Sequence, residues 1–199
     1  MPRQRLTKDM VVKAAFDLAR EGGLENVTVK GISQKLDCSV QPVYCYCRNM
    51  SGLKQDVIDY TGSYLQSFIN ERLDVNDMFQ SMGMAHAQFA KAEPHLYRLY
   101  FLRKRDDVHS FEDIYKKETD PQIAEFIARQ LGITIEKARQ LHLNMLIYNT
   151  GISFILTALG SDTDIGRVHD LLTQAKDIFT HSIIADSKQE EPNENNRTL

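Results

Sequence analysis

The sequence predicts an all-α protein. Apolar residues recur at intervals of three and four along most of its 199 residues, as in Val29, Ile32 and Leu36, and this is the spacing of one helix face. Side chains that favour the start of a helix, such as Thr7 and Thr28, stand before these runs. No segment shows the alternation of apolar and polar residues that a half-buried strand needs. We therefore expect about nine helices, three in an N-terminal domain and the rest in a larger C-terminal domain.

The first predicted helix begins after Thr7, whose hydroxyl can cap it, and runs to about Arg20. Gly22 and Gly23 end it, because glycine accepts the backbone conformation that commonly follows a helix. The apolar face of this helix is expected to consist of Val11, Ala14, Ala15, Leu18 and Ala19.

A more specific pattern follows in residues 25–53, which predict two short helices joined by a tight turn. Thr28 can cap the first of these helices and Ser39 the second. Pro42 is tolerated in the first turn of the second helix, where backbone amides have no partner inside the helix. The expected turn residues are Asp37, Cys38 and Ser39, and the expected inward residues of the second helix are Val40, Val43 and Cys47. This pattern is typical of a helix-turn-helix whose second helix lies in the major groove of DNA.

Residues 53–186 are expected to form a second helical domain. Ser51, Pro94 and Thr134 stand where helices of this part can begin. The expected helices span 51–73, 76–92, 95–102, 134–160 and a last segment that begins within 162–164, with one or two more inside 111–131. The tail, residues 187–199, is polar and is expected to be disordered. The predicted domain boundaries are therefore 1–52, 53–186 and 187–199.

Composition and charge indicate a cytoplasmic protein with no membrane partner. No signal sequence opens the chain, and the longest apolar run, residues 143–159, is too short and too polar to span a membrane. Residues 1–50 carry 8 basic and 5 acidic side chains, a net charge of +3, whereas residues 51–199 carry 16 and 22, a net charge of −6. A basic domain on an acidic body suits a protein that presents one end to DNA, although so small an excess also arises by chance.

The helix-turn-helix residues resemble those of the tetracycline-repressor (TetR) family of bacterial transcription regulators. The residues that carry the similarity are Gly22-Gly23, Val27-Thr28-Val29, Ile32, Leu36 and the run from Val43-Tyr44 and Tyr46 to Leu53. Three positions depart from the family: Asp37 replaces a usual Gly, Cys47 an aromatic or aliphatic residue, and Met50 a Lys that commonly reaches DNA phosphate. The resemblance implies a DNA-binding N-terminal domain and a helical domain for ligand binding and dimerisation.

The resemblance also implies which side chains meet double-stranded operator DNA. Base edges would be approached by Lys30, Val40, Gln41 and Pro42. Lys can bond guanine, Gln can pair with adenine, and apolar groups can contact thymine methyls. Tyr44 and Tyr46 can reach phosphates through their hydroxyls, or they can merely pack between helices. The full predicted DNA-binding set is Thr28, Lys30, Ser39, Val40, Gln41, Pro42, Tyr44, Cys45, Tyr46 and Arg48.

The three cysteines, Cys38, Cys45 and Cys47, all lie within ten residues, but their spacing matches no structural zinc site. We expect no metal and no cofactor. Cys45 and Cys47 point to different sides of a helix, so they cannot form a disulfide with each other. We expect Cys38 and Cys47 to face the core and Cys45 to be exposed. The alternative role for Cys45, on the DNA-facing side, is to make operator binding sensitive to oxidation.

A small-molecule effector is the next expectation. His86 lies on the apolar side of the helix predicted at 76–92, and in the TetR family this helix borders the ligand cavity. The residues expected to line a pocket for an apolar or amphipathic molecule are Tyr64, Phe68, Met82, His86, Phe89, Tyr97, Tyr148 and Asn149. The same residues also describe an ordinary core, so both interpretations stay open.

The last two predicted helices carry more apolar surface than one core face needs, and the first of them is apolar nearly all round between Leu143 and Leu159. A second buried face, and so a homodimer, explains the excess. The alternative is complete burial inside one chain. The expected interface residues are Ile155, Leu159, Leu171, Ala175 and Ile178.

Taken from sequence, the chain is expected to be a dimeric transcriptional regulator, a repressor that a ligand releases from DNA. The alternative is a TetR-like interaction module with weakened DNA binding, favoured by Asp37 and Met50. We do not expect an enzyme, because the sequence offers no paired catalytic carboxylates, nucleophile motif, metal-ligand cluster or phosphate loop. A gel-shift experiment or a fluorescence titration with DNA separates the first two readings.

Overall fold

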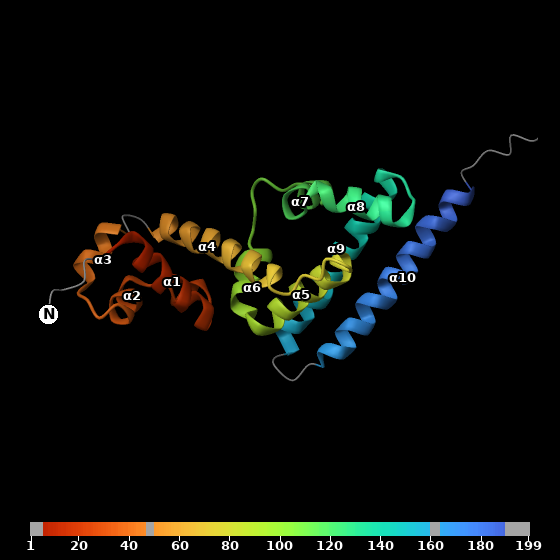
Figure 1. Cartoon of the computed structure of the whole chain (residues 1–199). Helices are drawn as coiled ribbons and strands as arrows, with labels where there is room; N and C mark the ends of the chain where they lie inside the picture. The colour runs from red at the N-terminus through yellow and green to blue at the C-terminus, as the bar shows by residue number, and fades with distance from the viewer. Residues whose placement is uncertain (1–5, 47–49, 160–163, 190–199) are drawn as a thin grey trace, which may run out of the picture. The chain divides into compact units, whose positions relative to one another are not determined.

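A computed structural model describes residues 6–46, 50–159 and 164–189 of the chain, and within these ranges it is all-α (Figure 1). The described residues form ten α-helices, one 3-10 helix and no strand. The helices are α1 (Lys8–Gly22), η1 (Leu24–Asn26), α2 (Val29–Lys35), α3 (Val40–Tyr46), α4 (Met50–Asn70), α5 (Met78–Ala92), α6 (Pro94–Phe101), α7 (Phe111–Glu118), α8 (Pro121–Leu131), α9 (Ile135–Leu159) and α10 (Ile165–Gln189).

The helices belong to two compact units. Unit 1 comprises Met1–Arg72, Gln88–Lys104 and Leu156–Ser161, and unit 2 comprises Leu73–Ala87, Arg105–Ile155 and Asp162–Leu199. The boundary expected after residue 52 falls inside α4, which belongs to unit 1. This difference arises because α6 packs against α1 and α4, so a segment distant in sequence completes the first unit.

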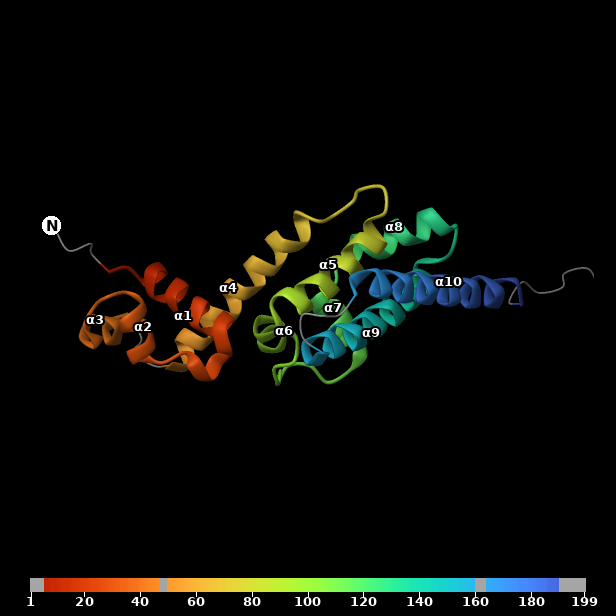
Figure 2. The ribbon, with the colours of Figure 1, turned by 90° about the horizontal axis from the view of Figure 1, so that it is seen from below.

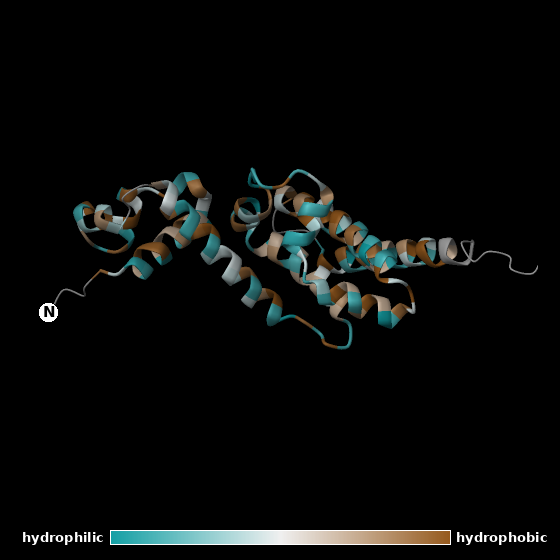
Figure 3. Ribbon diagram, turned by 90° about the horizontal axis from the view of Figure 1, so that it is seen from above, coloured by the Kyte–Doolittle hydropathy of each residue, from teal (hydrophilic) through white to brown (hydrophobic). Residues whose placement is uncertain are grey.

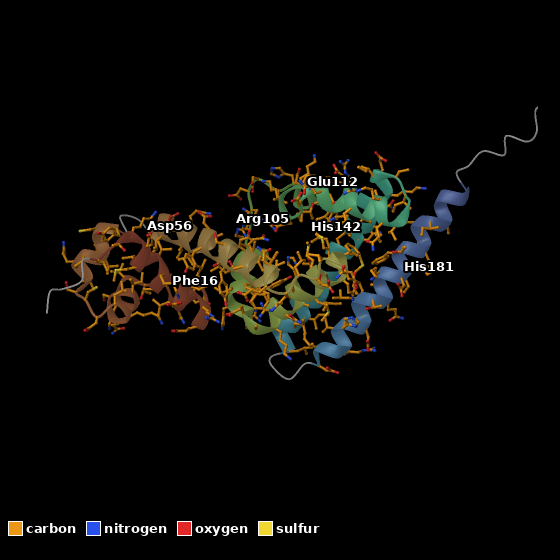
Figure 4. The ribbon with its side chains drawn as sticks, in the orientation of Figure 1. Phe16, Asp56, Arg105, Glu112, His142 and His181 are labelled. Carbon is orange, nitrogen blue, oxygen red and sulfur yellow. The ribbon has the colours of Figure 1, made fainter. Side chains whose placement is uncertain are left out.

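The core of unit 1 is built around α1. Phe16 is almost fully buried (labelled in Figure 4), and its ring centroid lies 4.7 Å from that of Tyr60 and 5.3 Å from that of Tyr64 on α4. Other fully buried side chains of this unit include Val11, Ile32, Val43, Val57 and Leu96, from α1, α2, α3, α4 and α6. Each of these helices therefore contributes apolar area to a shared core, which is the main favourable contribution to folding.

A buried carboxylate joins three helices of unit 1. Glu93, which precedes α6, is only 5% exposed. It accepts hydrogen bonds from both the Nε and the terminal nitrogen of Arg20 on α1, the first at 2.7 Å, and from the Tyr64 hydroxyl at 3.0 Å. The bond to Glu93 raises the pKa of Arg20, and burial, followed by the bond to Glu93, raises the pKa of Tyr64. A buried charge is tolerated here because it is paired and hydrogen-bonded.

In unit 2, α5, α9 and α10 lie side by side (Figures 1 and 2). The Phe79 ring packs at 5.8 Å against His142 of α9, and the Tyr148 ring of α9 lies 6.2 Å from Phe179 of α10. The Gln80 side chain of α5 donates to the Thr173 hydroxyl of α10 at 3.0 Å. Apolar and polar contacts thus both fix the register of these three helices.

Some element boundaries were left open by the sequence, and others differ from expectation. Residues 111–131 form two helices, because Asp120 caps α8 at the amide of Gln122 and Pro121 fits only at its start. Helix α4 begins at Met50, so Ser51 is not its cap, and it ends at Asn70 rather than near residue 73. Helix α10 continues through Gln189. Residues 187–189, where the sequence led us to expect the start of a disordered tail, belong to α10, and residues 190–199 lie outside the described ranges.

The helices carry both hydrophobic and hydrophilic residues around their circumference, as expected for helices that bury one face (Figure 3). Among the described residues, no helix combines the length and the apolar character that crossing a membrane requires.

Candidate nucleic-acid interface

Helix α2 begins at a capping residue and lies close to α1. The Thr28 hydroxyl accepts a hydrogen bond from the amide of Gly31 at 3.0 Å, as the sequence predicted for a capping residue. A Cβ atom at Gly31 would lie 3.2 Å from the Leu18 side chain and 3.1 Å from the Thr28 hydroxyl. Glycine at this position therefore lets α2 approach α1 closely. The Lys30 side chain is exposed.

The turn after α2 has the hydrogen bonds of a Schellman motif. The amide of Asp37 donates to the carbonyl of Gln34 at 3.2 Å, and the amide of Cys38 donates to the carbonyl of Ser33 at 3.0 Å. Asp37 has a φ of +48°, in the left-handed region that favours glycine. The turn expected at Asp37, Cys38 and Ser39 is thus present, and Asp37 supplies its left-handed residue.

Helix α3 is attached to unit 1 through Val43, the one fully buried side chain among its described residues. Pro42 lies in the first turn of α3, as expected. Val40, expected to face inward, is 43% exposed, whereas Val43 is fully buried. The exposed side chains of α3 are Val40, Gln41, Tyr44, Cys45 and Tyr46. A helix with so much free surface is available to contact a partner.

The two tyrosines of α3 have different environments. Tyr44 is 56% exposed. The Tyr46 hydroxyl donates to the backbone carbonyl of Leu6, just before α1, at 2.7 Å. A phosphate group only accepts hydrogen bonds near neutral pH, so Tyr46 cannot donate to one while it is bonded to Leu6. Tyr46 instead ties Leu6 to α3, a contact that the sequence did not indicate.

Much of the positive charge of unit 1 is already paired. Lys8 lies 2.9 Å from a carboxylate oxygen of Asp56, Lys35 lies 2.6 Å from Glu21, and Lys13 bonds Asp17 one turn along α1. Among the described residues, Lys30 forms no ion pair with a carboxylate. Arg48, a predicted DNA contact, lies outside the described residues. The candidate surface is therefore mostly polar and aromatic, with Lys30 as its clearest cation.

The cysteines show the expected difference in exposure only in part. Cys45 is exposed and its sulfur lies 3.6 Å from the carbonyl oxygen of Gln41, whereas Cys38 is half-buried rather than inside the core. Cys47 lies outside the described residues. Across the described part of the chain, no group of three or more His, Cys, Asp or Glu side chains is placed to hold a metal ion.

The eight residues predicted to line a ligand pocket divide equally between the two units. In unit 1, the rings of Tyr64 and Phe68 both contact Phe89, at 6.1 and 5.3 Å, and Tyr97 is 2% exposed. In unit 2, Nδ1 of His86 lies 2.9 Å from the carbonyl oxygen of Met82. The Asn149 Oδ1 atom of α9 is buried without a hydrogen-bond partner in the described structure. A role for these residues in ligand binding stays a prediction.

A cavity of about 500 Å³ lies elsewhere in unit 2, between α7, α8 and the first part of α9. None of its lining residues was predicted from sequence. They are Glu112, Tyr115, Lys116, Thr119, Pro121, Ala124, Arg139, Gln140 and Leu143. The cavity has no local sequence signal, because its residues belong to three helices whose individual patterns are those of ordinary surface helices.

The predicted interface residues differ in exposure. Ile155, Leu159 and Ile178 are 53%, 63% and 57% exposed, and Leu171 is half-buried. Ala175 is only 5% exposed in the single chain. It continues the buried stripe of α10 formed by Val168 and Leu172, at the spacing of one helix face, and therefore packs within its own chain.

Comparisons with known proteins give one structural match to report. No family model matches the chain, and no curated protein matches it. Among solved structures, the chain is similar to a transcriptional regulator from Rhodococcus sp. Rha1, with 16% sequence identity and a TM-score of 0.46. The match covers 91% of this chain and 97% of that chain. A similarity at this level assigns neither a family nor a function.

Proposed function

We propose that the protein is a DNA-binding transcriptional regulator of the tetracycline-repressor type, a repressor that a small-molecule effector releases. The observation that carries the proposal is the arrangement of α2, the left-handed turn at Asp37, and α3. Helix α3 is anchored by Val43 and presents Gln41 and Tyr44 to solvent. A helix-turn-helix reads DNA with the exposed face of its second helix.

Within this proposal, the contacts divide into two kinds. Gln41 reads a base, because its amide matches the edge of adenine, and Val40 and Pro42 contact thymine methyl groups. The hydroxyls of Tyr44 and Thr28 and the ammonium group of Lys30 meet phosphates or a neighbouring base. The exposure of all these side chains except the half-buried Pro42 supports the assignment.

We also propose that two copies bind DNA together. Exposed apolar side chains on α9 and α10, among them Ile155 and Ile178, support a homodimer because they would otherwise remain in water. Two helix-turn-helix elements on one face of DNA need a separation of about 34–36 Å, or a multiple of it, to enter successive major grooves. An effector that binds better to a state with another spacing would release the DNA.

The proposal includes no catalytic activity, and it places the protein in the cytoplasm with the DNA. A second function, an interaction module with weak DNA binding, is favoured by the ion pairs of Lys8, Lys13 and Lys35. Cations that already hold carboxylates contribute less to phosphate binding, and Met50 supplies none.

A fluorescence anisotropy titration decides between the two functions. The protein is titrated with the DNA upstream of its own gene and with a scrambled duplex of equal length. A regulator binds the first duplex far more tightly than the second. In Gln41→Ala the difference in binding free energy between the two duplexes becomes smaller by about 1–3 kcal/mol, through loss of discrimination at one base position of each half-site. Gln66→Ala, the same change on an exposed face of α4, is the control and keeps full discrimination. Equal, weak binding of both duplexes by the unaltered protein favours the interaction module.

A further inference from the structure

The cavity of unit 2 has an apolar floor and a charged rim. Ala124 of α8 is buried and Leu143 of α9 is half-buried, so they form its interior wall. Glu112 and Lys116 of α7 and Arg139 of α9 are exposed at its edge. A volume of about 500 Å³ lies within the range of sites for small organic ligands.

Two uncharged polar groups of the cavity wall, the hydroxyls of Tyr115 and Thr119, already form hydrogen bonds inside the protein. The Tyr115 hydroxyl lies 3.0 Å from Nδ1 of His142, and the Thr119 hydroxyl donates to the carbonyl of Tyr115 at 2.6 Å. Within the described ranges, no ion pair is formed by Glu112, Lys116 or Arg139. The groups able to recognise a ligand are therefore two cations, one carboxylate and the exposed amide of Gln140, and the rim carries a net positive charge.

We propose that this cavity binds an amphipathic small molecule with an apolar body and one anionic end, such as a carboxylate. Burial of the body against Ala124 and Leu143 removes apolar surface from water. The planar guanidinium of Arg139 binds a carboxylate through two parallel hydrogen bonds, and Lys116 adds a second positive charge. A cationic end of the same length would meet two like charges and only Glu112 as a partner.

A ligand in the cavity can affect the interior of unit 2 through contacts of His142. His142 is buried and its ring contacts both Tyr115 of α7 and Phe79 of α5, at 5.2 and 5.8 Å between centroids; Figure 4 labels His142 of α9 and Glu112 of α7. A ligand that displaces the Tyr115 ring must therefore break or move the bond to His142. The proposal that the cavity binds a ligand depends only on the cavity, whereas its role as the effector site rests on the proposed function.

Isothermal titration calorimetry of the full chain without DNA tests the binding site. The probes are dodecanoate and dodecylammonium, which share one chain and differ in the sign of the end group, each below its micelle concentration. We expect one dodecanoate per chain, bound about tenfold or more tightly than dodecylammonium. Arg139→Gln and Lys116→Gln together weaken dodecanoate binding by about tenfold or more. Arg129→Gln removes an exposed arginine of α8 outside the cavity and leaves binding unchanged.

Three results overturn the proposal: no heat of dodecanoate binding, equal affinity for the two probes, or binding that the double variant leaves unaltered. The effector role is tested separately by repeating the DNA titration with saturating dodecanoate. Dodecanoate binding without any change in operator affinity removes the effector role. A chain that binds dodecanoate but no DNA contradicts the proposed function and leaves the binding site in place.

Discussion

Asp37 is the residue at which local backbone chemistry and the proposed function meet. Its φ of +48° lies in a region that costs most L residues energy, and Asp tolerates it better than most because its short polar side chain bonds locally. The two hydrogen bonds of the Schellman motif depend on this conformation. The orientation in which α3 leaves α2 is therefore fixed at some cost in stability.

Asp37→Gly should remove that cost. We expect the free energy of unfolding to rise by about 1 kcal/mol, because glycine adopts a positive φ without steric strain. The greater conformational entropy of glycine in the unfolded chain offsets part of this gain. Urea denaturation followed by circular dichroism measures the change. Asp37→Ala is the matched control, since it keeps a Cβ atom in the left-handed conformation, and it should give no gain. Equal stabilisation by both variants would show that the lost carboxylate, rather than the backbone, is responsible.

The two tyrosines of α3 should respond differently to loss of one oxygen atom. Tyr44→Phe should weaken operator binding by about 0.5–1.5 kcal/mol and leave thermal unfolding unchanged, because its exposed hydroxyl is proposed to bond only DNA. Tyr46→Phe removes the bond to Leu6 and should loosen the segment just before α1, which faster hydrogen exchange in the first turn of α1 would detect. If Tyr44→Phe binds the operator normally, the tyrosine does not contact phosphate.

At the scale of helices, sequence predicted most elements because the information is local. Apolar spacing and caps such as Thr28 and Pro94 determine where α2 and α6 begin. The sequence was less decisive where two local signals compete or where packing determines the boundary. Asp120-Pro121 is a helix start inside a continuous apolar pattern, so the division between α7 and α8 was left open.

The candidate sites were less predictable, since they depend on contacts between distant segments. Local spacing placed Val40 on the inward face, but only Val43 reaches the core of unit 1. The bond from Tyr46 to Leu6 spans forty residues of chain and has no sequence signal. The cavity likewise exists only once α7, α8 and α9 pack together.

The packing of α7 on α9 gives unit 2 a dependence on pH. Burial lowers the pKa of His142 from 6.5 to about 4, and burial also lowers the pKa of His86. In the unfolded chain histidine takes up a proton below about pH 6.5. Between pH 6.5 and 4 the unfolded state therefore binds more protons, so stability should fall as the pH falls through this window.

His142→Gln should flatten this dependence. The loss attributable to His142 amounts to at most about 3 kcal/mol below pH 4, and urea unfolding between pH 7 and pH 4 measures it. His181→Gln, at an exposed position of α10, is the control and should retain the slope of the unaltered chain. The explanation fails if both variants lose stability with pH as steeply as the original protein.

For the whole molecule, the open question is what covers the apolar surface of α9 and α10. Ile147, Phe154 and Ile155 of α9 are about half exposed, and Gly151 between them has open space where a side chain would lie. The four residues at positions 147, 151, 154 and 155 are separated by four, three and one residues, which places them on one side of the helix. Ile178 of α10 is 57% exposed. Surfaces of this kind are commonly covered in oligomers by a second copy.

Substitution of this surface tests the homodimer. We expect the unaltered chain to sediment as a dimer at micromolar concentration. The double variant Ile155→Glu, Ile178→Glu should give a folded monomer. Both side chains are exposed in the single chain, so the fold tolerates the change, whereas a carboxylate buried in an interface is costly. Val75→Glu makes the same change at a residue that is 73% exposed outside α9 and α10, and should remain dimeric. Ala175→Glu should unfold unit 2 instead, since Ala175 is buried within its own chain. A dimer that survives both isoleucine substitutions would place the interface on another surface, and a monomeric unaltered chain would remove the homodimer from the proposed function.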